Sequence, residues 1–425
     1  MECVKLRKMA KGLAEVLTRV AILGMSAQIL LGLFWILTHF STFPKYEESL
    51  FLLKVQESLV FDEYTGILYP LLMRLLSMVA GAFSMPFYCL IYVIQLGVAA
   101  WAAFYFVAGL GGMKRAAGWF RALIALALLT MPVSLQCHLA VLPYSLAGSF
   151  FLMQLGMLLR AVRRGEVADH DGAKAWKGWK RPAWNLVRMG LAWTLQAFLL
   201  PEYYLFGGLL LVFYGLWEAF GKREDKEVLA KEEAARVFPI LLLTAVFLSL
   251  IPCVMKMTIA EDSGHGSNLA AATFQNSADK SLKEAVKDAV AYELSPAFHL
   301  LTLNGKGHYT QLAKNQEIMR WRTPFWTTVF ISFGGWCFLG ILLLGACLQA
   351  ATLIRRQGKK RFLAIRELIA LFLTGMAMVA YYSLWAGGAM DDKKTYVIAL
   401  LWVAAAGNAI ANNVRFEQKE KKAGE

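Results

Sequence analysis

The stretch Met85–Ala108, MPFYCLIYVIQLGVAAWAAFYFVA, contains no Asp, Glu, Lys or Arg and decides the class of fold. An uninterrupted apolar run of about 20 residues is typical of a helix that crosses a membrane. Similar runs recur along the 425-residue chain, which is 58% hydrophobic and 17% charged. A soluble domain would be about one quarter charged. The composition therefore excludes a water-soluble globule and predicts an all-α polytopic membrane protein.

We expect about ten spanning helices, because a helix satisfies its backbone amides within its own segment and about 20 residues suffice to cross. The first is preceded by a basic N-terminal stretch and is expected to be a signal anchor that is retained. The expected spans are Val20–Phe40, Met85–Ala108, Gly118–Ser134, Pro143–Val162, Leu186–Leu200, Tyr203–Phe220, Val237–Ile259, Pro324–Ile354, Ile365–Gly387 and Thr395–Asn413.

The placement of basic residues gives the expected orientation of these spans. Short loops assigned to the inside are basic, as in Arg160–Arg164 (RAVRR) and Arg355–Arg361 (RRQGKKR). An excess of Lys and Arg in short cytoplasmic loops is the usual determinant of membrane topology. We therefore expect a multi-pass protein of the cell membrane with both termini in the cytoplasm. The net charge of +14 is assigned to topology, and no nucleic-acid partner is expected.

Two expected outer segments exceed the length of a turn and divide the chain. Residues 1–259 form an N-terminal transmembrane module whose acidic first outer loop covers residues 41–83. Residues 260–323 form an extracytoplasmic loop, and residues 324–425 form the C-terminal transmembrane helices with a basic cytoplasmic tail. Loops carried by a rigid scaffold are the usual place for functional residues.

The end of the first outer loop, Ile67–Phe83, is apolar enough to be considered as a further membrane-spanning helix. Counting it would invert every later loop, and the segment carries Pro70 and Arg74. An amphipathic segment that does not cross can lie in the plane of the membrane surface. We therefore expect an interfacial helix on the outer side.

Paired carboxylates stand out in the first outer loop as Glu47-Glu48 and Asp62-Glu63. One interpretation is a solvated, negatively charged loop. The other is general-base catalysis, because a carboxylate near apolar surface gains proton affinity and can accept a proton from a hydroxyl nucleophile. In that case one acid holds the acceptor or a divalent cation while its neighbour accepts the proton. No other cofactor is expected, and the His and Cys residues form no HExxH, HxH or CxxC pattern.

Several segments in order resemble the GT-C superfamily, the polytopic glycosyltransferases that use polyprenyl-phosphate sugars, including the protein mannosyltransferase-like family 39 and lipid A aminoarabinose transferase relatives. Tyr46-Glu47-Glu48-Ser49 looks like the opening of their first outer loop, and Gly66-Ile-Leu-Tyr-Pro resembles the start of the interfacial helix that follows. Later segments that resemble the family are Met131-Pro-Val-Ser, Leu142-Pro-Tyr-Ser, Leu200-Pro-Glu-Tyr-Tyr and Lys393-Lys-Thr-Tyr396.

The resemblance implies inverting transfer of a sugar from a polyprenyl-phosphate donor to a hydroxyl acceptor on the outer membrane face. Glu47 is then the catalytic base, Glu48 positions it or the acceptor, and Asp62 is the second choice of base. Cationic groups would stabilise the leaving phosphate. The residues expected to bind substrate are Arg74, Glu202, Arg320, Arg322, Lys393, Lys394 and Tyr396. Membrane lipids are the other expected partners.

Two other classes of function remain open on the sequence. A secondary transporter or lipid flippase would carry ionisable residues in mid-span and paired halves with broken helices. The apolar runs here contain almost no charge and show no internal repeat. A non-catalytic envelope assembly protein would tolerate the loss of every outer carboxylate.

Overall fold

The computed structural model describes residues 12–13, 15–30, 66–83, 87–110, 117–131, 134, 137–138, 141–167, 182–200, 203–220, 238–248, 251, 324–355, 369, 372, 376 and 396–410. Within these residues the regular structure is α-helical, and no strand occurs. The main helices are α3 (Leu68–Ala82), α4 (Phe87–Gly109), α5 (Ala117–Thr130), α7 (Tyr144–Val167), α8 (Pro182–Leu199), α9 (Tyr203–Phe220) and α14 (Pro324–Arg355). Helical segments also cover residues 15–30, Phe238–Leu248 and Tyr396–Ile410.

The helix ends follow local sequence signals. The bounds of α9 are those expected from its apolar run. Helix α5 ends at Thr130, short of the expected Ser134, because Pro132 disfavours helical backbone at the residue before it. Helix α8 starts at Pro182, ahead of the expected Leu186, since proline suits the first position of a helix.

The all-helical class is confirmed for the described residues. By length and composition, one helix among them, Cys89–Gly109, is long and apolar enough to cross a membrane. Shorter apolar helices include Leu68–Ala82, Phe238–Leu248 and Tyr396–Ile410. The full number of spans and the three-part division of the chain stay predictions.

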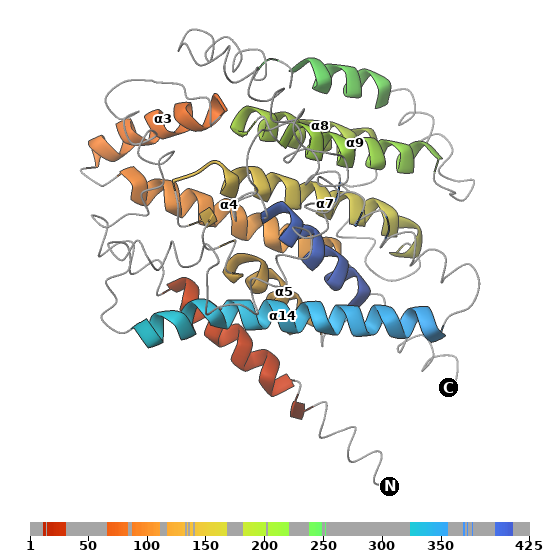
Figure 1. Ribbon diagram of the computed structural model, residues 1–425. Helices are drawn as coiled ribbons and strands as arrows, with labels where there is room; N and C mark the ends of the chain where they lie inside the picture. Colours follow the sequence, from red (N-terminus) through yellow and green to blue (C-terminus); the bar gives the residue numbers. More distant parts are fainter. Residues whose placement is uncertain are drawn as a thin grey trace, which may run out of the picture.

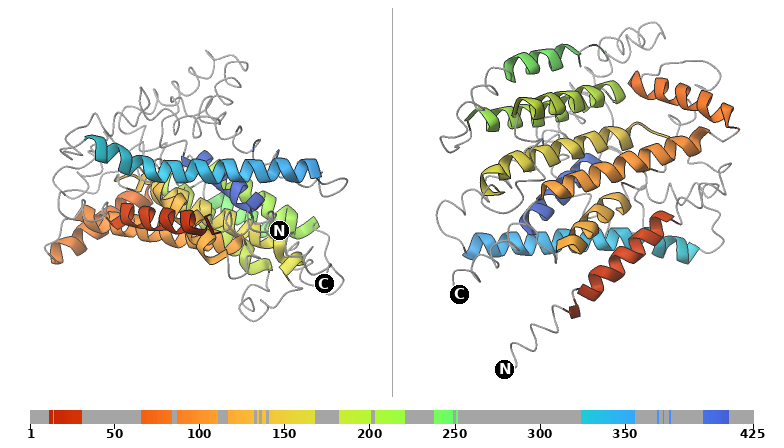
Figure 2. Two further views of the ribbon diagram at one scale, coloured as in Figure 1. Left: turned by 90° about the horizontal axis from the view of Figure 1, so that it is seen from below. Right: turned by 180° about the vertical axis from the view of Figure 1, so that it is seen from behind.

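The long helices lie side by side, and consecutive helices along the chain from α4 to α9 alternate in direction, so the neighbours α4 and α7 run the same way (Figures 1 and 2). Helix α4 packs on α5 and α7, and α8 packs on α7 and α9. Interactions between these helices show which ends meet. The Gln95 amide, near the start of α4, donates to the Leu142 carbonyl just before α7, at 2.9 Å. We name this end of the bundle the expected outer end, and the end at Gly109 the expected inner end.

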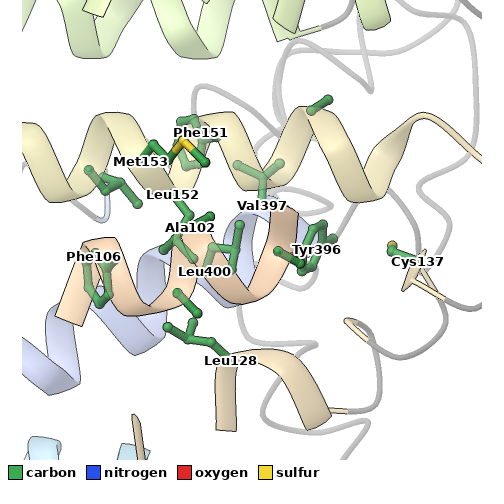
Figure 3. Packing of buried hydrophobic residues seen from close by; sticks show 14 of the residues in the cluster. Ala102, Phe106, Leu128, Cys137, Phe151, Leu152, Met153, Tyr396, Val397 and Leu400 are labelled. Carbon is green, nitrogen blue, oxygen red and sulfur yellow. The ribbon is translucent and has the colours of Figure 1, made fainter. Parts of the chain in front are cut away.

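Small residues allow the central helices to approach closely. A Cβ on Gly109 would lie 2.7 Å from the Gly156 carbonyl oxygen, and a Cβ on Gly156 would lie 3.0 Å from the Phe106 Cα. The backbones of α4 and α7 are therefore in direct contact, as is usual where helices pack through small side chains. Figure 3 shows the adjoining core, in which Phe106, Phe151 and Leu400 point inward from three helices.

A buried amide pair links α7, α8 and α9. The Gln196 amide donates to the Gln154 Oε1 at 2.8 Å, and Gln154 donates to the Met189 carbonyl at 3.0 Å. A Cβ on Gly207 would lie 2.5 Å from the Gln196 Oε1, so the glycine leaves room for the pair. Hydrogen bonds of this kind are a recognised means of joining apolar helices.

Candidate functional site

Two of the residues expected to form the site are described, namely Arg74 and Tyr396. The others lie outside the described residues: Glu47, Glu48, Asp62, Glu202, Arg320, Arg322, Lys393 and Lys394. Their assigned roles therefore stay predictions. Arg74 and Tyr396 both belong to elements at the expected outer end of the bundle.

Arg74 lies half-buried in the middle of α3, the helix expected to be interfacial. The Ser77 hydroxyl donates to the Arg74 carbonyl at 2.8 Å, within the helix. Helix α3 has an apolar face in the protein interior and exposed apolar side chains on the other side, so Arg74 lies between two apolar surfaces. The buried residues are Tyr69, Pro70, Met73, Leu76 and Ala80, and the exposed ones include Leu71, Leu75 and Met78.

Helix α3 begins beside the end of α8. The Gly66 N–H donates to the Leu199 carbonyl at 3.0 Å, and α3 packs against both α4 and α8. Leu199 is the last residue of α8, and α9 starts at Tyr203. The start of the element that carries Arg74 is thus joined to the end of α8, three residues before the expected substrate-binding residue Glu202 in the sequence.

Tyr396 is buried in a polar cluster at the same end of the bundle. Its ring meets His138 edge to face, with centroids 5.9 Å apart, and a Cβ on Gly148 would overlap the Tyr396 ring. The His138 Nδ1 lies 2.7 Å from the Ser145 Oγ. These residues make up the His138 cluster, defined as Ser134, Cys137, His138, Ser145 and Tyr396. At 2% exposure, Tyr396 fills the core here, and its predicted contact with substrate stays a prediction.

Burial governs the charge of the His138 cluster. It lowers the pKa of His138 to about 3, so the imidazole is neutral at physiological pH. Among the described residues, the His138 Nε2 has no hydrogen-bond partner. A histidine with so low a pKa is poorly suited to general-base catalysis near neutral pH. The cluster can instead hold the α5–α7 connection against the start of the last described helix.

The neutral state of His138 predicts a loss of stability in acid. An unfolded histidine has a pKa of about 6.5, and the folded value is about 3. Between these values the unfolded chain binds a proton that the folded chain does not. The stabilisation is therefore complete above pH 6.5 and declines as the pH falls towards 3, reaching a loss of about 2 kcal/mol at pH 5.

The measurement is the free energy of unfolding in detergent from pH 7 to 5, for wild type and His138→Asn. The asparagine retains a polar group near Ser145 but does not titrate. Carboxylate titrations common to both proteins cancel in the difference, so the wild type is expected to lose more stability. Parallel pH profiles would show that His138 titrates in the folded state as it does in the unfolded state.

The sequence predicted no role for His138, or for Ser145, which is the last residue of the Leu142-Pro-Tyr-Ser segment that resembles the GT-C superfamily. Neither belongs to a metal-binding or nucleophile motif, and the two residues are separated by the Leu142-Pro143 turn. The available signal was a histidine within a short Pro- and Ser-containing connection between two apolar runs. Among the described residues, no group of three or more His, Cys, Asp or Glu side chains is placed to hold a metal ion.

A different group of polar contacts lies at the expected inner end. The Arg160 guanidinium stacks over the Tyr105 ring at 3.8 Å and donates to the Tyr105 carbonyl at 2.7 Å. Arg188 lies over the Trp184 ring at 5.4 Å. Such cation–π contacts allow an arginine to lie against apolar surface. They stabilise basic residues at the end opposite to Arg74.

The comparisons with known proteins give one structural match. No family model and no curated protein matches the chain. The solved structure is that of the Archaeoglobus fulgidus oligosaccharyltransferase, tethered by a disulfide bond to an acceptor peptide with the NVT sequon. It is 14% identical, with a TM-score of 0.24, and the match covers 78% of this chain and 48% of that one. This chain thus matches about half the length of that protein. The resemblance to the GT-C superfamily stays a prediction.

Proposed function

We propose that the chain is a multi-pass membrane glycosyltransferase that moves a sugar from a polyprenyl-phosphate donor to a hydroxyl acceptor on the outer face. The supporting observation is convergence at one end of the bundle. The expected site residue Tyr396 is described at the expected outer end. Gly66 and Leu199, which are hydrogen-bonded at the same end, are four and three residues from the expected site residues Asp62 and Glu202. Helix α3, with Arg74, begins at the same place.

The surface of the described helices supports placement in a membrane. Large apolar side chains are widely exposed, which is typical of surfaces that meet lipid or another protein. Examples are Trp101, Phe104, Leu191, Trp336 and Leu343. The exposed apolar residues belong to several helices of the bundle, as expected for a surface surrounded by lipid.

Arginine placement supports the proposed orientation. Arg121 lies near the start of α5, Arg160 near the end of α7 and Arg188 near the start of α8. All three helix ends belong to the expected inner end, whereas Arg74 belongs to the outer one (Figure 1). Basic residues concentrate on the cytoplasmic side of membrane proteins, which supports a cytoplasmic location for the inner end.

The proposed reaction has a balanced course. A hydroxyl oxygen of the acceptor attacks the anomeric carbon, and the new C–O bond forms as the bond from that carbon to the phosphate oxygen breaks. The acceptor proton passes to the carboxylate of Glu47, and the electron pair leaves with the polyprenyl phosphate. Arg74 and the other basic residues expected at the site stabilise the negative charge on that phosphate.

The test is transfer of radiolabelled sugar by purified protein in lipid vesicles. Polyprenyl-phosphate-linked mannose, glucose and aminoarabinose are supplied as donors, with acceptor glycans or peptides that carry free hydroxyls. The expected result is sugar on the acceptor and free polyprenyl phosphate in equal amounts. Movement of intact donor between leaflets, with no cleavage, would overturn the proposal and support the lipid flippase. If the protein neither transfers sugar from any donor nor moves a donor between leaflets, the result would favour the non-catalytic assembly protein.

A further inference from the structure

The junction between Gly66 and Leu199 closes the end of α8. The last four carbonyl groups of a helix lack partners within that helix. The Leu199 carbonyl is one of these, and the Gly66 N–H supplies its hydrogen bond at 3.0 Å. The donor comes from a residue more than a hundred positions earlier in the chain. This contact therefore ties the start of α3 to the end of α8 by main-chain atoms alone.

The junction requires a glycine. A Cβ at position 66 would overlap the Phe198 carbonyl oxygen and would lie 2.8 Å from the Leu199 carbonyl carbon. Both neighbours are backbone atoms of α8, and Gly66 itself is buried. A side chain could be accommodated only by moving α3 away from α8.

A shift of the backbone at Gly66 would also move Arg74. Two buried residues, Tyr69 and Pro70, follow the junction and start the packed face of α3. Gly66 precedes α3 by two residues, and Arg74 is six residues after the first residue of α3, Leu68, about 9 Å along it at the rise of an α-helix. Because a helix is stiff over two turns, a shift at its start displaces the Arg74 guanidinium relative to the end of α8.

We propose that Gly66 is a positioning residue that acts through Arg74 on the phosphate group of the lipid-linked donor. This inference rests on the proposed function, in which Arg74 stabilises that phosphate. The contact from Gly66 to Leu199 sets the placement of the cation on α3 relative to the end of α8. The donor phosphate meets Arg74 in the productive position only when this contact is formed.

The test compares Gly66→Ala with Gly81→Ala. Gly81 lies on the same helix, is exposed, and a Cβ there meets nothing within 4 Å. Loss of a charge-assisted contact corresponds to about a tenfold rise in the KM for polyprenyl-phosphate sugar in Gly66→Ala. We expect kcat to fall as well, because the negative charge that Arg74 stabilises on the phosphate increases as the bond from the anomeric carbon breaks. Gly81→Ala is expected to match wild type in both constants.

A double-mutant cycle separates positioning from general loosening of the fold. If Gly66 acts through Arg74, adding Gly66→Ala to Arg74→Gln should raise the donor KM by no more than about twofold. An equal rise in KM in both backgrounds would overturn the positioning role. The KM values are compared only between variants that still unfold cooperatively on heating.

Hydrogen exchange tests the junction without any substrate. In wild type the Gly66 amide is expected to be protected, and in Gly66→Ala the amides of α3 should exchange faster than in Gly81→Ala. A rapidly exchanging Gly66 amide in wild type would overturn the inference even if Gly66→Ala fails to fold. Protection as expected, in a protein that transfers no sugar, would overturn the proposed function and the role towards phosphate but leave the junction in place.

Discussion

Replacing Glu47 by glutamine is expected to lower sugar transfer by about 10²–10⁴-fold, the usual contribution of a general base. Glutamine keeps the shape of the side chain and its hydrogen bonding but cannot accept the proton of the acceptor hydroxyl. Donor binding should change much less, since the proton is transferred only during the reaction. Glu48→Gln is expected to have a smaller effect on kcat and a larger one on the KM for the acceptor, because Glu48 is assigned to positioning.

The matched control is Glu15→Gln. Glu15 is an exposed carboxylate that pairs with Arg19 at 2.7 Å. It belongs to the first described helical segment, residues 15–30, and so lies outside the expected first outer loop at residues 41–83. An exposed pair of this type contributes little to stability, so the variant should transfer sugar at the wild-type rate. Transfer that survives both Glu47→Gln and Glu48→Gln would remove the pair as the catalytic base. The same assay on Asp62→Asn then decides whether the second acidic pair supplies it.

Replacing Gly345 by leucine is expected to destabilise the protein by at least about 3 kcal/mol, at the upper end for overpacking of a core. Gly345 lies in α14 and faces the last described helix. A Cβ at this position would lie 2.6 Å from both the Cα and the Cβ of Ala406. The Ala406 Cα belongs to the backbone, so the two helices would have to separate.

Gly340→Leu provides the control on the same helix. Gly340 is exposed, and a Cβ there meets nothing within 4 Å. Leucine is a better helix former than glycine by up to about 1 kcal/mol, so this variant is expected to unfold at or above the wild-type temperature. The measurement is thermal unfolding in the same detergent. Equal melting temperatures for the two variants would contradict the close contact between α14 and residues 396–410.

The sequence predicted the individual helices well where strong local signals bounded them. Helix α9 has the expected limits because Pro201 precedes it and the charged stretch beginning at Lys222 follows it. Helix α3 also forms over almost the whole of the expected Ile67–Phe83 segment. Helix α7 continues to Val167, beyond the expected Val162, since an apolar run marks the part suited to a membrane and not where a helix must stop.

The candidate site was less accessible to sequence reasoning. Acidic and basic residues could be recognised as candidates because their chemistry is evident from their type. Burial could not be recognised, and only the structure shows that the Tyr396 side chain lies in the core; its predicted contact with substrate stays a prediction. The partners of His138 were missed for the same reason, since they are contributed by α7 and by the helix at residues 396–410.

The amino-acid sequence by itself determined the helical class, the position of most helix ends and the asymmetry of basic charge. These features depend on short stretches of chain, through apolar runs, prolines and the residues next to them. The tertiary structure alone decided that Gly66 meets Leu199, that Gln196 meets Gln154 and that Tyr396 covers His138. Each of these contacts joins residues far apart in the chain, and each requires the helices to be packed before the two partners are within reach.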